Sequence, residues 1–203
     1  MEDEMIQIGI LLFDWVEELD FVGPYEVLAA AQDVRPDDIE VRTYALDTLE
    51  VTCNKRLKVT AHARAADSPQ LDVLLVPGGN GSREAAKDPR VIDWVQTQAR
   101  GCRWVTSVCT GARVLEAAGL VDGKRITTFH DAIDELRRSG RAAEVMAGVR
   151  YVRDGNLVTS AGVSAGIDMA LWLLGQLASP AFAREVQAKI EYFPAPPYTA
   201  ETE

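Results

Sequence analysis

Strand-length runs that are rich in apolar residues place the strongest constraint on the fold of this chain. Residues 5–13, 71–76 and 103–108 are runs of this kind. A strand that is apolar on both faces is typical of a parallel sheet with helices on both sides. The sequence therefore predicts a three-layer α/β/α sandwich with a mostly parallel central sheet, of the flavodoxin-like type.

The segments between these runs carry helix and turn signals. We expect a loop over residues 14–23 and a helix that begins at Pro24, because proline suits the first turn of a helix. The Asp154-Gly155 pair predicts a tight turn between two strands, within residues 149–160. Further strands are predicted at 39–45 and 124–129, a short hairpin at 51–61, and helices at 89–99, 111–118, 131–136, 165–176 and 180–190.

The length of the chain indicates how many domains it forms, and its net charge indicates which kinds of partner it can bind. The 203 residues are expected to form a single domain, 1–203, whose proline-rich end, 191–203, is an extended arm. A net charge of −10 disfavours nucleic acid and anionic membranes, so a small-molecule substrate is the expected partner. The acidic start lacks the features of a signal peptide, which predicts a cytoplasmic protein.

Cys109 follows an apolar strand and precedes small residues that allow a sharp bend into a helix. A thiol at such a bend is placed like the serine of a nucleophile elbow. The start of the following helix offers free N–H groups and the positive end of the helix dipole, which favour the thiolate over the thiol. The alternative is a small buried hydrophobic residue, as most free cysteines are. The context favours a reactive nucleophile.

Asp20 and the Gly78-Gly79 pair are expected at the same edge of the sheet as Cys109, because each follows a predicted parallel strand. Asp20 would carry protons to and from the sulfur and a substrate atom. Its other interpretation is a helix cap or a solvated loop carboxylate. The N–H groups of the glycine pair would stabilise an oxyanion.

The histidines and the two other cysteines carry weaker signals. His130 is interpreted either as a residue of the substrate-binding crevice that acts as a base for Cys109, or as a helix cap. His62 is expected to be exposed. Cys53, in a predicted surface meander, and Cys102, before the strand, are expected to be structural. The chain has no histidine and carboxylate cluster at ligand spacing, so no metal site is expected.

Several motifs together resemble the ThiJ/PfpI superfamily, which has the class I glutamine amidotransferase-like fold. The resemblance spans nearly the whole chain in the same order and is specific for the superfamily. The motifs lie at residues 19–28, 76–79, 105–112, 117–120, 126–128, 153–157, 165–168 and 191–197.

The resemblance implies a homodimeric enzyme without a cofactor, in which Cys109 is the nucleophile and Asp20 its carboxylate partner. It also implies that Thr110 takes part in catalysis, and that the N–H groups around Gly79 and Thr110 bind an anion. Relatives often have Thr-Thr-His at the end of the strand near residue 128. Here Phe129 holds that place, so the resemblance favours a cysteine–aspartate pair over a histidine-assisted site.

Within the superfamily, the chain is similar to enzymes that hydrate isonitriles to N-substituted formamides. This hydro-lyase reaction is the leading expectation. The alternatives are glyoxalase-like or deglycase-like work on small carbonyl compounds, amide hydrolysis, and a non-enzymatic sensor of ligands or oxidation. The last would resemble the ligand-binding half of AraC-type regulators, and a cysteine placed like Cys109 can report oxidation.

Overall fold

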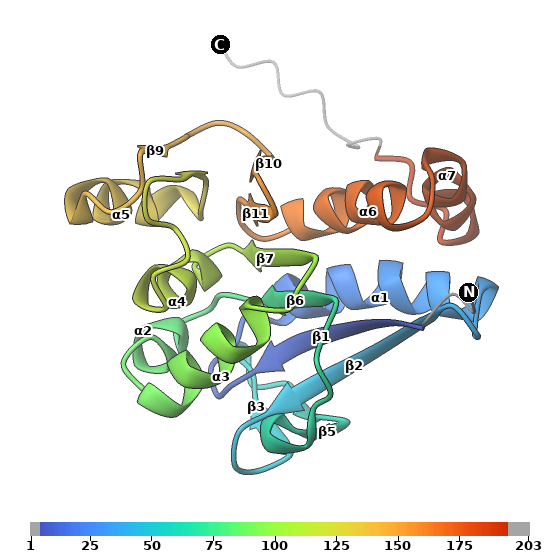
Figure 1. Cartoon of the computed structure of the whole chain (residues 1–203), viewed down its shortest axis with the longest axis horizontal. Coiled ribbons are helices and arrows are strands. Elements are labelled where there is room, and N and C mark those ends of the chain that lie inside the picture. The colour runs from blue at the N-terminus through green and yellow to red at the C-terminus, as the bar shows by residue number, and fades with distance from the viewer. Residues whose placement is uncertain (1–4, 195–203) are drawn as a thin grey trace.

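The computed structural model describes residues 5–194 and is built on a seven-stranded sheet (Figure 1). Every neighbouring pair of strands is parallel except one, β10 with β11. The prediction of a mostly parallel α/β fold is therefore confirmed. In spatial order the strands are β10 (Tyr151–Asp154), β11 (Leu157–Ser160), β7 (Trp104–Val108), β6 (Val73–Val76), β1 (Ile6–Leu12), β2 (Ile39–Ala45) and β5 (Ala63–Arg64).

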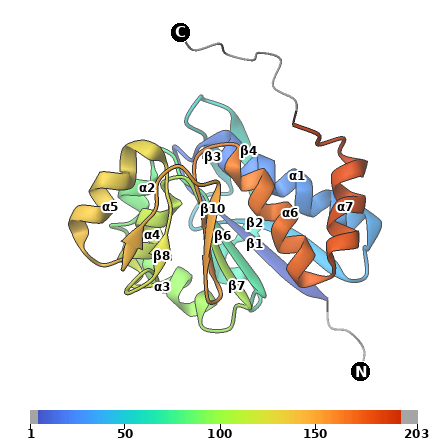
Figure 2. The ribbon, with the colours of Figure 1, turned by 90° about the horizontal axis from the view of Figure 1, so that it is seen from above.

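Helices cover both faces of this sheet, as Figure 2 shows. One face carries α1 (Glu18–Val34), α6 (Ala165–Leu177) and α7 (Pro180–Lys189). The other carries α2 (Ser82–Ala85), α3 (Pro89–Ala99), α4 (Gly111–Ala117) and α5 (Ile133–Ser139). The core consists of two hydrophobic clusters, one on each face, because the central strands are apolar on both sides.

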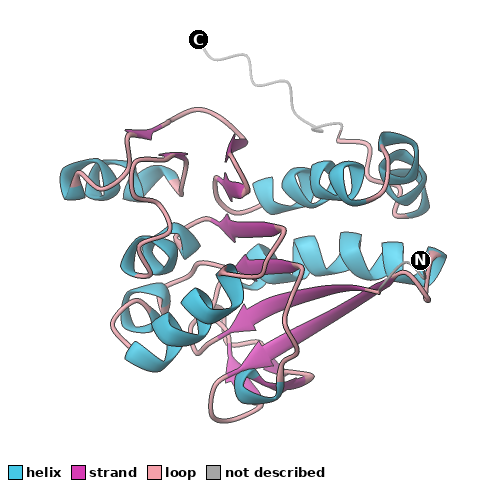
Figure 3. Ribbon diagram, viewed as in Figure 1, coloured by secondary structure: helices cyan, strands magenta, loops and turns pink. Residues whose placement is uncertain are grey.

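Two small sheets flank the main one (Figure 3). β3 (Glu50–Thr52) and β4 (Lys58–Thr60) form the antiparallel hairpin predicted within residues 51–61. β8 (Arg125–Ile126) and β9 (Glu144–Val145) pair in parallel beyond α4. Short 3-10 turns occupy Ala65–Asp67 and His130–Ala132.

The predicted loop over residues 14–23 is confirmed only for residues 14–17, because α1 begins at Glu18 and contains Pro24 in its interior. Close packing against α6 explains the difference. A side chain at Gly23 would come within 2.9 Å of Ile167, and one at Gly166 within 2.9 Å of Pro24. Burial of this closely packed face outweighs the hydrogen bond that a proline removes from a helix.

The predicted strand at 124–129 is also shorter than expected, because side chains replace its backbone ladder. The N–H of Thr127 donates to the hydroxyl of Thr159 at 2.7 Å, and the hydroxyl of Thr127 donates to the carbonyl of Met146 at 2.8 Å. The helix predicted at 131–136 begins as a 3-10 turn at His130 and becomes α5 at Ile133. Most of the arm predicted at 191–203 lies outside the described residues.

We predict that Leu75→Ala, in the central strand β6, lowers the free energy of unfolding by about 2–5 kcal/mol, since Leu75 is fully buried and its removal leaves a cavity. Urea denaturation measures this loss. Phe193→Ala is the control, because Phe193 is 64% exposed and lies outside the core, and it should change the value by less than about 1 kcal/mol. Equal losses in both variants would contradict the assignment of the core.

Candidate active site

Cys109 occupies the bend between β7 and α4 with a φ of 56°, a conformation that costs a non-glycine residue about 1 kcal/mol or more. Two neighbours hold it there. Its N–H donates to the carbonyl of Ser160 at 3.1 Å, and its carbonyl accepts from the hydroxyl of Thr128 at 2.7 Å. Gly111 allows the start of α4 to pack closely against the end of β6, because a side chain at this position would lie 2.1 Å from the carbonyl oxygen of Val76. The predicted sharp bend is therefore present.

The thiol of Cys109 is buried, with Asp20 and Thr110 as its polar neighbours. The residue is only 5% exposed. A side chain at Gly162 would lie 3.1 Å from the sulfur of Cys109 and 2.5 Å from the ring of Phe129. The absence of a side chain at Gly162 therefore makes room for both the thiol and the ring. Phe129 therefore lies where the resemblance would have placed a histidine.

Asp20 lies in the first turn of α1 and is completely buried. Its Oδ2 accepts a hydrogen bond from the N–H of Gly78 at 3.0 Å. Its Oδ1 accepts no hydrogen bond from any of the described residues. Burial raises the pKa of Asp20 to about 7, while the Gly78 N–H and the nearby thiol of Cys109 oppose part of this rise.

The thiol and the carboxyl influence each other directly. Burial, and secondly the charge of Asp20, raise the pKa of Cys109, while the N–H of Thr110 lowers it. The expectation that the start of the helix favours the thiolate is therefore wrong for the resting thiol, because desolvation and the neighbouring carboxylate outweigh the helix end. At pH 7 the Asp20 carboxyl is half protonated, and above this pH the thiol and the carboxyl together hold one proton, which is assigned to the pair and not to either group alone.

The Gly78-Gly79 turn connects α1 to the cysteine bend. Gly78 donates to Asp20 and accepts from the N–H of Glu17 at 3.0 Å. Gly79 donates to the hydroxyl of Thr110 at 3.0 Å and accepts from it at 3.2 Å. Gly79 has a φ of 112°, and a side chain there would lie 2.3 Å from the N–H of Glu17, so only glycine fits.

The predicted oxyanion donors are thus engaged inside the protein. The N–H groups of Gly78 and Gly79 both donate to protein oxygens, and either would serve a substrate only after exchanging that bond. Their role as oxyanion donors stays a prediction.

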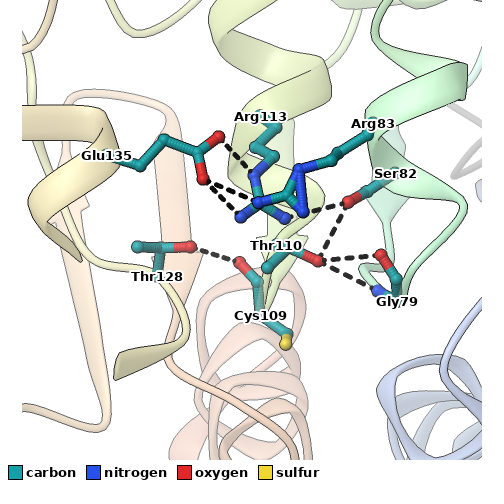
Figure 4. A network of polar contacts seen from close by, with 8 residues as sticks. All are labelled: Gly79, Ser82, Arg83, Cys109, Thr110, Arg113, Thr128 and Glu135. Atoms are coloured by element: carbon teal, nitrogen blue, oxygen red, sulfur yellow. Dashed lines mark hydrogen bonds and ion pairs between the residues drawn. The ribbon is translucent and has the colours of Figure 1, made fainter. Parts of the chain in front are cut away.

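Thr110 belongs to a polar network on the α4 side of the bend (Figure 4). Ser82 donates to the Thr110 hydroxyl at 3.0 Å, and Arg113 donates to Ser82 at 3.4 Å. Two hydrogen bonds, of 2.8 and 2.7 Å, join Arg113 to Glu135. Sequence reasoning did not identify these three residues. Ser82 and Arg113 lie close in sequence to Gly79 and Cys109, but nothing local relates Glu135, on α5, to the site.

The structure places His130 on the surface. Its side chain is 78% exposed, its ring lies 3.2 Å from the carboxylate of Asp131, and its centroid is 4.1 Å from that of Phe129. No hydrogen bond joins it to Cys109 in the part of the chain that the structure describes. Its contribution to substrate binding stays a prediction.

The remaining candidates take no part in this site. Cys102 is buried, and so is Cys53, which corrects the prediction of a surface position for its segment. His62 is exposed, as expected. Within residues 5–194, no three His, Cys, Asp or Glu side chains are grouped to hold a metal ion, and no helix is long and apolar enough to cross a membrane.

Comparisons with known proteins show the family and the fold of the chain. The model of the DJ-1/PfpI family matches residues 6–176. The chain is 43% identical to isonitrile hydratase of Pseudomonas putida over 95% of its own length and 81% of that protein's. It is 30% identical to the transcriptional regulator GbdR of Pseudomonas aeruginosa, over 83% of this chain but only 46% of the regulator.

Solved structures of ThiJ/PfpI and DJ-1 proteins have the same fold as this chain. The crystal structure of a ThiJ/PfpI family protein from Pseudomonas syringae has a TM-score of 0.87 and 30% identity, and covers 98% of this chain and 79% of its own. Drosophila melanogaster DJ-1beta has a TM-score of 0.80 and 23% identity, covering 94% of this chain and all of its own, which supports the fold alone.

We predict that Asp20 makes the folded protein less stable as pH rises from about 4 to about 7. Its pKa is 3.8 in a model peptide and about 7 in the folded protein, so the folded state binds more protons in this range. The shift corresponds to a loss on the order of 4 kcal/mol. Asp20→Asn should remove this slope and be more stable than the wild type at pH 8, as measured by urea denaturation across the range.

The control for this experiment is Asp131→Asn, at a side chain that is 76% exposed, which should keep the wild-type slope. If Asp20→Asn kept the slope as well, the raised pKa of Asp20 would be refuted.

Proposed function

Because the chain belongs to the DJ-1/PfpI family, we propose that it is an enzyme that hydrates organic isonitriles to N-substituted formamides. Cys109 is the nucleophile and Asp20 the proton carrier. The observation that supports this most is the buried Asp20 carboxyl, whose pKa lies near 7 and whose second oxygen has no regular partner among the described residues. Identity of 43% to an isonitrile hydratase supports the substrate class.

The chemistry of an isonitrile suits this pair. Its terminal carbon has to accept both a nucleophile and a proton, and no amine leaves in the first step. A thiol and a carboxyl that share one proton supply both needs, without a separate histidine. An isonitrile is also neutral, which suits a sulfur that is enclosed by Phe129 and Gly162.

In the first step, the Cys109 thiolate forms a carbon–sulfur bond with the terminal carbon. The electron pair that develops on this carbon takes the proton of the Asp20 carboxyl. The product is a thioimidate, R–N=CH–S–Cys109, and Asp20 is left as a carboxylate. Addition and protonation at one carbon require the two groups on the same side of the substrate, as the Asp20–Cys109 contact provides.

In the second step, the Asp20 carboxylate removes a proton from water, and the hydroxide adds to the thioimidate carbon. The nitrogen takes that proton from Asp20. The tetrahedral adduct then expels the Cys109 thiolate as its hydroxyl proton passes to Asp20. R–NH–CHO is released and the one-proton pair is restored, so that one water is consumed in each turnover.

Two copies of the chain are part of the same proposal. Three hydrophobic side chains near the start of α1 and the β3–β4 turn are unusually exposed, namely Leu19 at 40%, Val22 at 38% and Leu57 at 50%. The turn is attached to α1, since Asn54 donates to Glu17 at 2.8 Å. A homodimer that covers this apolar surface is expected, and its mass in solution tests it.

We predict that Cys109→Ala lowers the hydration rate of cyclohexyl isocyanide by about 1,000-fold or more, and Asp20→Asn by about 100-fold, because each removes one half of the pair. Cys102→Ala is the matched control, since this buried thiol lies outside the site and its loss should leave turnover unchanged. Formamide production measures all three.

Retained turnover in Cys109→Ala would refute the proposal. A protein that consumes methylglyoxal through Cys109, but not the isonitrile, would instead support the carbonyl alternative. A protein without turnover of either, whose Cys109 is oxidised selectively by peroxide, would support the sensor.

We predict that kcat/KM for the isonitrile rises with pH through about 7. Below this pH both groups of the pair are protonated and no thiolate forms, and loss of the first proton creates the reactive state. Initial rates between about pH 5 and 9 give this profile. A rate that is constant from pH 5 to 9 would exclude Asp20 as the group that titrates.

A further inference from the structure

We propose that a chain of three side chains outside the Cys109–Asp20 pair positions the Asp20 carboxyl. The chain consists of Glu135, Arg113 and Ser82, and it ends on the hydroxyl of Thr110 (Figure 4). These residues act on the carboxyl through other groups, so they are positioning residues. Their value to catalysis rests on the proposed function, whereas their effect on the proton affinity of Asp20 does not.

The Thr110 hydroxyl has a single arrangement of hydrogen bonds that satisfies both Gly79 and Ser82. A hydroxyl donates once and accepts twice. The N–H of Gly79 can only donate to it, and the carbonyl of Gly79 can only accept from it. The Thr110 proton therefore points to the Gly79 carbonyl, and the remaining lone pair accepts from Ser82.

Arg113 fixes the direction of the Ser82 hydroxyl. Ser82 is completely buried, and its oxygen lies 3.4 Å from Nη1 of Arg113, which can only donate. The Ser82 oxygen therefore accepts from Arg113, and its proton is directed to Thr110. Without Arg113, the Ser82 hydroxyl is free to reverse and to accept from Thr110, which would then lose its bond to the Gly79 carbonyl.

Glu135 holds the guanidinium of Arg113 in this orientation. Nε of Arg113 donates to Oε1 and Nη2 to Oε2, a two-point contact that fixes the plane of the guanidinium. The Arg113 side chain is only 11% exposed. Arg83 also contacts Glu135, at 3.1 Å, but its side chain is 58% exposed, and Ser82 is not among its partners within the described residues.

The effect reaches Asp20 through the glycine turn. Thr110 holds both the N–H and the carbonyl of Gly79, and the preceding N–H, of Gly78, is the backbone donor to the Asp20 carboxyl. Gly78, Thr110 and Asp20 are in close contact. A side chain at Gly78 would lie 2.5 Å from the backbone nitrogen of Thr110 and 2.9 Å from Oδ2 of Asp20. A shift of the turn therefore changes the strength of the Gly78 hydrogen bond.

This arrangement also redefines the role of Thr110. Its hydroxyl already makes the one donor and two acceptor bonds that it can make. Its proton has one further acceptor nearby, the sulfur of Cys109. Thr110 thus fastens the cysteine bend to the glycine turn.

The test follows the titration of Asp20 in the full-length protein, by NMR of its ¹³C-labelled side-chain carboxyl, assigned by its absence in Asp20→Asn. Ser82→Ala and Arg113→Met should raise the titration midpoint by about 0.5–1 pH unit, as expected when part of a hydrogen bond to a charged group is lost. Arg113→Lys, which keeps a donor, should restore part of the change. Arg83→Met is the matched control, because it removes one positive charge beside Glu135 but no bond to Ser82.

Unchanged midpoints in folded Ser82→Ala and Arg113→Met would overturn the proposal, even if both variants melt at lower temperature. An equal shift in Arg83→Met would overturn it too, because charge and not the hydrogen-bond chain would then be responsible. If the wild type hydrates no isonitrile while the midpoints shift as predicted, the positioning role stands and only the proposed function fails.

Discussion

The burial of Asp20 beside Cys109 is the interaction on which the rest of the site depends. A carboxylate without full hydrogen bonding is costly inside a protein, and the protein reduces this cost by raising the pKa of Asp20 to about 7 and by one backbone hydrogen bond. The same burial keeps the thiol protonated at rest. The two groups are in contact, and above pH 7 they hold one proton between them. The local environment, more than the helix end, therefore determines the reactivity of Cys109.

The surrounding fold serves to hold these two groups in contact. Asp20 comes from the first turn of α1 and Cys109 from the bend after β7, which are far apart in sequence. The Gly78-Gly79 turn, after β6, lies between them and binds each side through both its N–H and carbonyl groups. Three adjacent strands of a parallel sheet bring these segments to one edge, which is where ligands bind in folds of this type.

Apolar runs and local turn signals were sufficient to predict the layers of the fold and the bend at Cys109, since both follow from short stretches of sequence. The predicted start of α1 was wrong because Pro24 is typical of a first helical turn, whereas packing against α6 keeps this proline inside the helix. The sign of the Cys109 pKa shift was wrong because burial and the charge of Asp20 arise only in three dimensions. The network through Ser82, Arg113 and Glu135 could not be predicted, because it joins separate helices and has no sequence spacing of its own.

The central claim is that an isonitrile becomes covalently bound to Cys109 during turnover, and intact-protein mass spectrometry after rapid acid quench tests it directly. We expect a species heavier by the mass of one cyclohexyl isocyanide, located on the peptide that contains Cys109, which forms and decays at rates that match turnover. Formamide production without any such adduct on Cys109 would contradict the account.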